Sequence, residues 1–241
     1  DAMGLAFEWM IDLCNRQDAD IWLCIPHAAD DDFISQLASL VKEKLEPELK
    51  VYIEYSNEVW NFRVQQDHAK AQGLALNLAS DEFEAGMKYQ AYRSAQIWKV
   101  FEDTLSDERV INVISGQSTN AWLSDNYHLK PLFDENFNPT GVLPEAYGIA
   151  PYFGGNGLDG NDPDIWEKLH TDIFKHRFNN PNGDSRVQDV IEQFEHTQNY
   201  GIDLICYEGG QHVGTNAVAP NRSPKMYDLY IDYLDTLNHY V

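Results

Sequence analysis

Short apolar segments recur along the chain, and longer stretches with a helical spacing of apolar residues separate them. Segments that are apolar throughout are typical of strands buried on both faces of a parallel sheet. Because strands and helices alternate in this sequence, the pattern predicts a parallel sheet covered by helices. The five predicted strands lie near 21–25, 51–55, 110–115, 147–152 and 203–207, and the predicted helices at 2–16, 33–45, 63–105 with a break near 73–80, 164–177, 187–199 and 222–240.

Polar residues indicate where several of these helices begin. The acidic triplet Asp30–Asp32 suits a helix N-terminus, where the backbone dipole favours negative charge. Either Ser80 or Asp81 is expected to cap the second part of the long helical region. Pro163 is placed to open the next helix as its first residue.

Composition and charge narrow the class of protein. The chain has 241 residues, of which 43% are hydrophobic, enough for one sizeable core. Its net charge of -22 disfavours nucleic acid and anionic membranes as partners, because both would be repelled. No apolar stretch is long enough to span a bilayer, which takes roughly 20 residues. The three cysteines follow neither a disulfide framework nor a zinc ribbon, and we predict core or near-core thiols at Cys14, Cys24 and Cys206.

Polar and aromatic residues gather directly after the predicted strands. In α/β barrels, catalytic groups occupy the C-terminal ends of the strands, so these positions are candidate site residues. Two of the strand ends carry a lone glutamate, and paired carboxylates are what glycosidic cleavage requires, one as proton donor and one as nucleophile or base. The candidates are His27, Asn57, Glu58, Trp60, Gln117, Trp122, Tyr152, Glu208 and His212.

The motif SNEVWN around Glu58 resembles the Asn-Glu acid/base motif after strand four of clan A glycoside hydrolases. The motif YEGG around Glu208 resembles their strand-seven nucleophile. The resemblance implies a (β/α)8 TIM barrel, a retaining mechanism, and no metal or organic cofactor. It makes Tyr152 the counterpart of a tyrosine that hydrogen-bonds the nucleophile, and His27 the histidine after strand three.

On this resemblance the five strands correspond to strands three to seven of the barrel. The chain 1–241 is then a single catalytic domain that lacks the first two strands and the last one, and it has the character of a fragment of a longer protein. The arginine that the family carries on strand two and the tryptophan on strand eight have no counterpart here. Open sheet edges would favour self-association, and secretion or a periplasmic location is favoured by analogy alone.

Two other functions stay open. The missing strands are compatible with a carbohydrate-binding protein without catalysis. A lyase or aldolase of the same fold is disfavoured, because a Schiff-base aldolase needs a lysine at a strand end and none is present. Glu54, inside the strand before Glu58, is interpreted as structural, and His27 with the acidic triplet is interpreted as a solvated helix start rather than a metal site. The sugar and the linkage are not predicted.

Overall fold

The computed structural model describes residues 4–61 and 63–241 of the chain. These residues form two compact units, where the sequence analysis expects one domain. The first unit comprises Asp1–Gly116 and Asp125–Tyr147, and the second comprises Gln117–Ser124 and Gly148–Val241. Each unit is described by itself.

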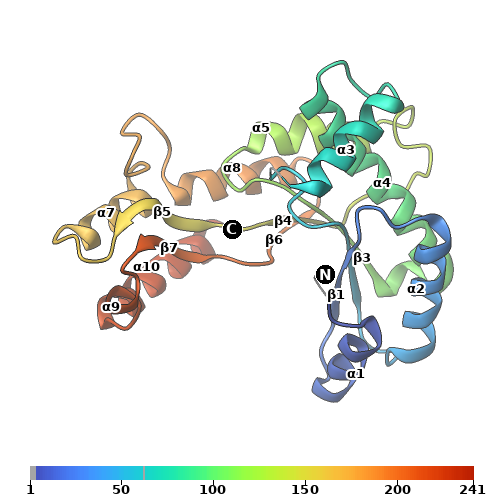
Figure 1. The fold of residues 1–241 in the computed structure, drawn as a ribbon, viewed down its shortest axis with the longest axis horizontal. Coiled ribbons are helices and arrows are strands. Elements are labelled where there is room, and N and C mark those ends of the chain that lie inside the picture. Colours follow the sequence, from blue (N-terminus) through green and yellow to red (C-terminus); the bar gives the residue numbers. More distant parts are fainter. Residues whose placement is uncertain (1–3, 62) are drawn as a thin grey trace. The chain divides into compact units, whose positions relative to one another are not determined.

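Five strands form a parallel sheet with the order β1-β2-β3-β4-β6, which follows their order along the chain. Figure 1 traces the strands and the helices that alternate with them along the chain. The α/β class and the parallel sheet with covering helices predicted from the sequence are confirmed. In the first unit, Ile21 pairs with Val51 and Val51 pairs with Val110, so the three strands run in register from their first residues. Their C-terminal ends therefore lie at the same edge of the sheet.

The first unit contains the first three strands and the helices that alternate with them. Its elements are α1 (Phe7–Gln17), β1 (Ile21–Ile25), α2 (Asp31–Lys44), β2 (Val51–Tyr55), α3 (Val64–Ala75), α4 (Glu82–Leu105), the short 3-10 helix η1 (Asp107–Arg109), β3 (Val110–Ser115), most of the π-helix η2 (Ser124–Leu129), α6 (Lys130–Leu132) and the first half of β4 (Ala146–Ile149).

The core of the first unit lies between the sheet and its helices. The alternate residues of β1 are buried, and these are Ile21, Leu23 and Ile25. Helix α2 begins where the acidic triplet predicts, because the Asp30 carboxylate accepts a hydrogen bond from the Phe33 amide. Asp81 caps α4 in the same way. Gly73 lets α3 approach α4 closely, since a Cβ there would lie 2.0 Å from the Ala85 carbonyl oxygen.

The second unit is built around a pair of short parallel strands and three longer helices. Its elements are α5 (Ala121–Leu123), the second half of β4, β5 (Tyr152–Asp159), α7 (Ile165–Phe174), α8 (Arg186–Gln198), β6 (Asp203–Cys206), β7 (Gly210–Thr215), α9 (Val218–Asn221) and α10 (Pro224–Tyr240). Strand β5 pairs with β7. Phe153, Leu169 and Tyr233 belong to the core that α7, α8 and α10 form with these strands.

Three local predictions are corrected by the second unit. The predicted strand 147–152 is two strands, because the ladder of β4 ends at Ile149 and β5 begins at Tyr152, beyond Pro151. Pro cannot donate to a ladder, which explains the break. Tyr152 therefore begins β5 instead of ending β4. Helix α7 begins at Ile165 after Asp164, so Pro163 is not its first residue.

The cysteine prediction is wrong for two of the three thiols. Cys24 on β1 and Cys206 on β6 are exposed, and Cys14 is intermediate. Strands β1 and β6 are the two outer strands of the sheet order. An apolar run predicts a strand that is buried on both faces. On these two outer strands, however, the other described residues do not fully cover the side chains of Cys24 and Cys206.

Candidate active site

Glu58 lies in the tight loop that follows β2. Ser56 and Glu58 both have positive φ angles, 62° and 47°. Left-handed backbone costs a non-glycine residue about 1 kcal/mol or more and is a feature of functional sites. The loop is closed by Asn61, whose Nδ2 donates to Glu58 Oε2 at 2.6 Å and whose amide donates to the Glu58 carbonyl at 2.9 Å. The Glu58 side chain is half-buried and held in one orientation.

Helix α3 fixes the backbone of the same loop through two glutamine side chains. Gln65 Nε2 donates to the carbonyl of Asn57 at 3.0 Å, and Gln66 Nε2 donates to the carbonyl of Trp60 at 2.7 Å. Gln66 is buried, whereas Asn57 is exposed. The Trp60 ring is buried as well, so it packs in the core of the first unit.

Glu54 lies on β2, in the strand that precedes Glu58, and is 2% exposed. Its Oε2 accepts a hydrogen bond from the Trp22 indole at 3.0 Å and a longer one from the Cys24 thiol at 3.6 Å. Burial raises the pKa of Glu54 to about 7. Nearby hydrogen-bond donors oppose this increase, and the charge of Glu58 adds to it. The Glu58 carboxylate therefore lies near enough to Glu54 to disfavour the ionised form of Glu54.

His27 follows β1, and its backbone carbonyl accepts a hydrogen bond from the Tyr55 hydroxyl at 3.0 Å. Its ring lies edge-on to the ring of His68, with centroids 5.4 Å apart, and His68 lies edge-on to Tyr89. Burial lowers the pKa of His68, and the charges of His27 and Arg93 add to the decrease. A neutral imidazole both donates and accepts hydrogen bonds, as sugar hydroxyls require.

The sequence analysis missed His68 and Asn61. His68 is in the middle of α3, and only its neighbours in space distinguish it from any other helical histidine. Asn61 could have been found, because it is part of the motif SNEVWN that identified Glu58.

In the second unit, Glu208 lies in the turn between β6 and β7 and is exposed. The turn is held by the Cys206 thiol, which donates to the Glu208 carbonyl, and by the amide of Tyr207, which donates to the carbonyl of Ile149 at 3.2 Å. Glu208 lines a mostly apolar cavity of about 300 Å³. The other lining residues are Pro151, Cys206, Tyr207, Gly209, Gly210, Tyr230, Tyr233, Leu234 and Leu237.

Gly210, the second glycine after Glu208, is explained by its own backbone angle and by the neighbouring helix α10. Gly210 has a φ of 130°, and a Cβ there would lie 2.5 Å from the Tyr230 hydroxyl oxygen. The same hydroxyl accepts a hydrogen bond from the Gln211 amide at 2.7 Å. Only glycine combines this backbone angle with so close a contact.

Tyr152 and His212 lie side by side at the start of the β5–β7 pair. Tyr152 is paired in register with Gly210, and its ring lies edge-on to the His212 ring, with centroids 6.1 Å apart. The Tyr152 side chain is 38% exposed. Tyr152 and Glu208 thus belong to adjoining parts of one unit, although Tyr152 reaches that position from the start of β5.

Gln117 and Trp122 lie in the segment that joins the second unit after β3. The carbonyl of Gln117 accepts a hydrogen bond from Gln193 Nε2 of α8 at 2.7 Å, and its side-chain oxygen accepts one from Asn120 at 3.3 Å. The side chain of Gln117 therefore helps to shape its own loop. Trp122 on α5 is 59% exposed.

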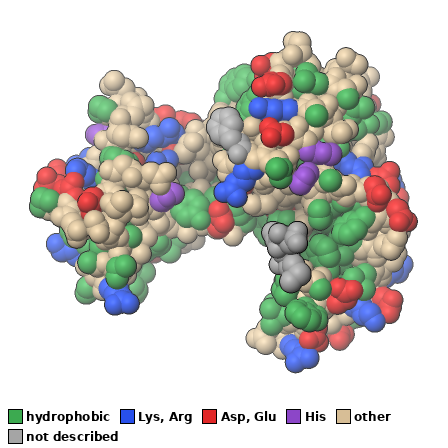
Figure 2. All heavy atoms as spheres, in the orientation of Figure 1, with side chains coloured by type: hydrophobic (Ala, Val, Ile, Leu, Met, Phe, Trp, Pro, Cys, Tyr) green, Lys and Arg blue, Asp and Glu red, His purple; other side chains and the backbone are tan. Residues whose placement is uncertain are grey.

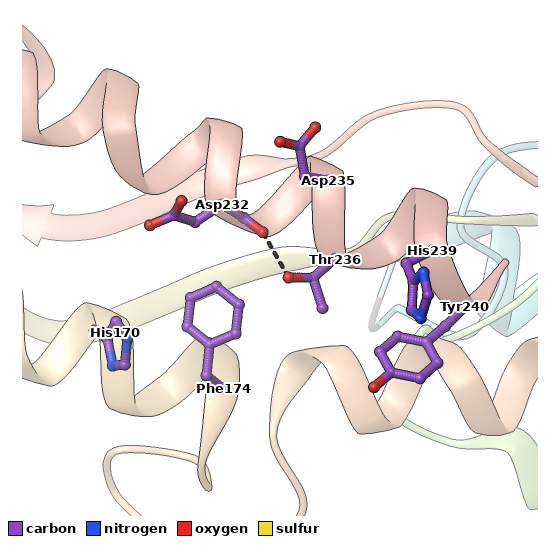
Figure 3. Close-up of a pocket in the computed structure, with 7 residues that line it drawn as sticks. All are labelled: His170, Phe174, Asp232, Asp235, Thr236, His239 and Tyr240. Atoms are coloured by element: carbon purple, nitrogen blue, oxygen red, sulfur yellow. Dashed lines mark hydrogen bonds between the residues drawn. The ribbon is translucent and has the colours of Figure 1, made fainter.

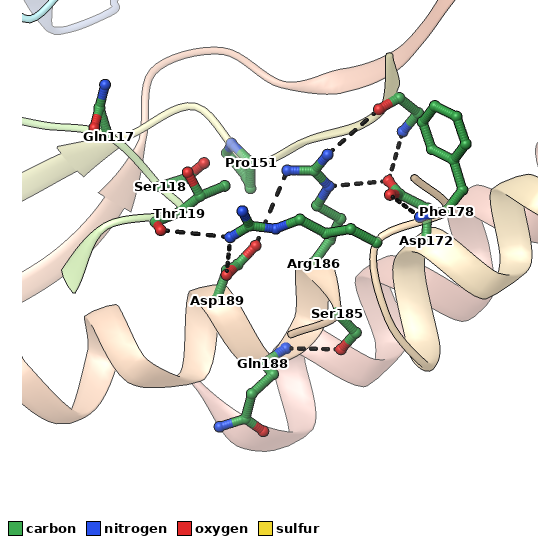
Figure 4. Close-up of polar contacts among 12 residues, drawn as sticks. Gln117, Ser118, Thr119, Pro151, Asp172, Phe178, Ser185, Arg186, Gln188 and Asp189 are labelled. Carbon is green, nitrogen blue, oxygen red and sulfur yellow. Dashed lines mark hydrogen bonds and ion pairs between the residues drawn. The ribbon is translucent and has the colours of Figure 1, made fainter. Parts of the chain in front are cut away.

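A network of two arginines and two aspartates lies within the second unit (Figure 4). Arg186 Nε pairs with Asp172 Oδ2 at 2.9 Å, and Arg177 pairs with Asp189 at 2.7 Å. Asp172 is fully buried, and its carboxylate also accepts hydrogen bonds from the backbone amides of Gly154 and Phe178. Arg177 continues the network to the Thr119 carbonyl, so one set of charges ties β5, α7 and α8 to the loop that carries Gln117.

A second concave surface lies between α7 and α10 (Figure 3). It is an open groove of about 530 Å³ lined by His170, Phe174, Asp232, Asp235, Thr236, His239 and Tyr240. Thr236 is tied to its own helix, since its hydroxyl donates to the carbonyl of Asp232 at 2.6 Å. None of the candidate site residues lines this groove.

The candidates thus fall into two groups. His27, Asn57, Glu58 and Trp60 belong to the first unit, and Gln117, Trp122, Tyr152, Glu208 and His212 belong to the second. Comparisons of the chain with protein-family models, with curated proteins and with solved structures found no match.

Charged side chains on the face drawn in Figure 2 are dispersed, and the basic ones do not merge into a patch there. The described residues include no group of three or more His, Cys, Asp or Glu side chains placed to hold a metal ion. Within residues 4–61 and 63–241, no helix is both long enough and apolar enough to cross a membrane.

Proposed function

We propose that this chain carries the catalytic core of a retaining glycoside hydrolase of the (β/α)8 class that acts on O-glycosidic bonds of a poly- or oligosaccharide. The observation that carries the proposal is the placement of two glutamates directly after strands of one parallel sheet, Glu58 after β2 and Glu208 after β6. Ends of parallel strands are where this class of enzyme places its catalytic groups.

The proposed reaction is a double displacement. Glu58 protonates the departing glycosidic oxygen while the Glu208 carboxylate attacks the anomeric carbon, which forms a covalent glycosyl-enzyme. Glu58 then removes a proton from water, the water oxygen bonds to the anomeric carbon, and Glu208 leaves as a carboxylate. His27, Asn57, Gln117, Tyr152 and His212 offer hydrogen-bonding groups for sugar hydroxyls, and no cofactor takes part.

Two features of the structure support this division of roles. Asn61 holds the Glu58 carboxylate at 2.6 Å in a strained loop, which suits a group that must meet a specific oxygen. Glu208 has an exposed side chain beside a glycine pair and lines a cavity, which suits a nucleophile that substrate must approach closely.

The test is an assay of hydrolysis on a panel of neutral polysaccharides and oligosaccharides, in which the release of reducing ends is measured. Glu58→Gln and Glu208→Gln should each reduce kcat by at least ~1000-fold, and the released sugar should retain its anomeric configuration by NMR. Glu43→Gln, an exposed glutamate on α2, is the matched control and should retain full activity. Wild-type rates in either catalytic variant, or an inverted product, would contradict the assignment.

Carbohydrate binding without catalysis is the alternative. It is favoured by two aromatic rings of the second unit that are accessible to solvent, Trp122 at 59% and Tyr152 at 38% exposure. Sugar rings stack on exposed aromatic faces, which combine an apolar surface with a polar edge. In that case titration calorimetry would show oligosaccharide binding that Trp122→Ala weakens and Glu208→Gln leaves intact, while no sugar in the panel is cleaved.

We also propose that the chain self-associates. Helix α10 exposes a stripe of Tyr227, Ile231 and Leu234 at helical spacing, and α1 exposes Trp9 and Leu13. Exposed apolar stripes and the outer strands of a sheet favour association. Sedimentation at increasing concentration should show a species above 27.6 kDa that Ile231→Glu reduces. A monomer at all concentrations would contradict this proposal.

A further inference from the structure

Three buried side-chain atoms of the second unit have no hydrogen-bond partner among the residues that the structure describes. They are Nε of Arg177, which is a donor, and Oδ2 of Asp189 and Oε1 of Gln193, which are acceptors. Asp189 is 4% exposed, and Gln193 is fully buried. Buried polar groups of native proteins are nearly always hydrogen-bonded, because an unsatisfied group loses its bonds to water on folding. These three unpaired atoms therefore call for a partner that the described residues do not supply.

The contacts of the three side chains place the unpaired atoms around one space. Arg177 Nη2 donates to the other carboxylate oxygen of Asp189, Oδ1, at 2.7 Å (Figure 4). Asp189 and Gln193 are four residues apart on α8, so their side chains are neighbours on one face of the helix. Gln193 Nε2 donates to the Gln117 carbonyl at 2.7 Å, and Arg177 Nη2 donates to the Thr119 carbonyl at 3.5 Å. All three side chains thus meet between α8 and the same loop.

The charges around this space limit what it can bind. A metal cation at Asp189 would meet two positive charges for one negative charge, because Arg177 pairs with this carboxylate and Arg186 Nη1 lies 4.0 Å from its Oδ2. An anion would be repelled by Asp189 and would meet an acceptor on Gln193. The Gln193 amide is held in this orientation, because its Nε2 faces the Gln117 carbonyl. A small neutral molecule that both donates and accepts hydrogen bonds is what fits.

We propose that one buried water molecule binds here, accepts a hydrogen bond from Arg177 Nε, and donates one each to Asp189 Oδ2 and Gln193 Oε1. A buried water typically makes about three hydrogen bonds, and one donor with two acceptors is the set that a single water satisfies. The water joins the ion pair of Arg177 and Asp189 to Gln193, so that the side chains that hold the loop of Gln117 act together. This inference does not depend on the proposed function.

NMR of the full chain with 15N-labelled arginine tests the site directly. We expect an Overhauser cross-peak between water and the Nε–H proton of Arg177. Laboratory-frame and rotating-frame spectra together distinguish a bound water from surface water and from proton exchange by the signs of the cross-peak. The Nε–H of Arg186 is the matched control, because it donates directly to Asp172 Oδ2 at 2.9 Å and should show no such cross-peak. An Arg177 signal that also lacks it would overturn the proposal.

A pair of variants on α8 tests the part of Gln193. Gln193→Met keeps a side chain of similar length but removes the acceptor, so the cross-peak of Arg177 should be lost. Gln188→Met changes an exposed glutamine of the same helix and should leave the cross-peak as it is in the wild type. A cross-peak that persists unchanged in Gln193→Met would show that Gln193 does not bind the water.

A crystal structure of the wild-type chain decides the geometry even if a variant fails to fold. The water oxygen should lie within about 3.2 Å of all three unpaired atoms. The competing arrangement is a pair in which Arg177 Nε donates directly to Asp189 Oδ2, beside the existing bond to Oδ1. That bidentate pair would leave no place for the water, and observing it would show that the proposal is wrong.

Discussion

The two glutamates after the strands occupy very different surroundings. Glu58 is half-buried in a loop that three amide side chains fix, those of Asn61, Gln65 and Gln66, and a second carboxyl group lies near it. Glu208 is exposed in a turn that the Cys206 thiol and the backbone amide of Tyr207 hold, and its own carboxylate is not fixed by an amide side chain of the described residues. One carboxyl group is oriented by its protein neighbours, and the other is left open to approach.

This difference is consistent with the two roles that we propose for these glutamates in glycosidic cleavage. A proton donor benefits from a controlled environment that sets when it is protonated, whereas a nucleophile benefits from access to the anomeric carbon. The first unit places polar side chains around its glutamate loop, whereas the ion pairs of the network around Asp172 in the second unit do not include Glu208. The comparison can be tested by disturbing each unit separately.

The largest expected effect comes from the buried charge network of the second unit. Asp172→Ala removes a fully buried carboxylate that Arg186 and two backbone amides contact, and leaves that arginine partly buried without this partner. Breaking such a pair on one side costs about 3–5 kcal/mol. Hydrogen exchange should show lost protection in α7, α8 and β5, while the amides of β1, β2 and β3 keep theirs.

The matched control is Asp162→Asn, which weakens a more solvent-accessible pair with Lys168 in the same unit. Pairs in contact with solvent contribute little, so protection in α7 and α8 should stay at the wild-type level. Equal losses of protection in both units after Asp172→Ala would mean that the network supports the whole chain, and the contrast between the units would not hold.

A smaller effect concerns acid stability of the first unit. His128 is fully buried, its Nδ1 lies 2.9 Å from the Tyr147 hydroxyl oxygen, and burial lowers its pKa to about 3. Between that value and about 6.5, the unfolded chain binds a proton that the folded chain does not. Its contribution is therefore complete above about pH 6.5 and is lost as the pH falls, by about 3 kcal/mol at about pH 4.

Urea unfolding from neutral to mildly acidic pH measures this dependence. His128→Phe should flatten the slope of the free energy of unfolding with pH, even if the variant is less stable at neutral pH. Glu54 acts with the opposite sign, because its pKa is raised to about 7. The folded chain binds the additional proton, so its contribution is lost as the pH rises from about 4.3 to about 7. An unchanged slope in His128→Phe would show that His128 is protonated in the folded chain.

The sequence predicted the first unit better than the second, for physical reasons. The apolar runs at 21–25, 51–55 and 110–115 are strands with those bounds, because burial on both faces leaves a pattern that can be read directly. The run 147–152 was not resolved into two strands, and β7 was missed, because Gly210–Thr215 carries little apolar signal and depends on pairing with β5. From the sequence, Glu54 is interpreted as structural, and the sequence does not show that the neighbouring strand β1 places the Trp22 and Cys24 donors beside its carboxyl group.

The smallest effect tests whether α3 orients the Glu58 loop. Gln66→Ala removes a buried amide that donates to the Trp60 carbonyl at 2.7 Å. The carbonyl is then left unsatisfied, at a cost of about 1–3 kcal/mol. Gln65→Ala is the control on the same helix, because its bond to the Asn57 carbonyl lies at an exposed position where water replaces it. For this control we expect a loss of about 0.5 kcal/mol at most.

Hydrogen exchange of residues 56–61 measures the same contrast locally, because a loop that loses a buried contact opens more often. Exchange should become faster in Gln66→Ala and stay near the wild-type rate in Gln65→Ala. If both variants loosen the loop equally, burial of Gln66 does not set its rigidity, and Asn61 becomes the contact that orients Glu58.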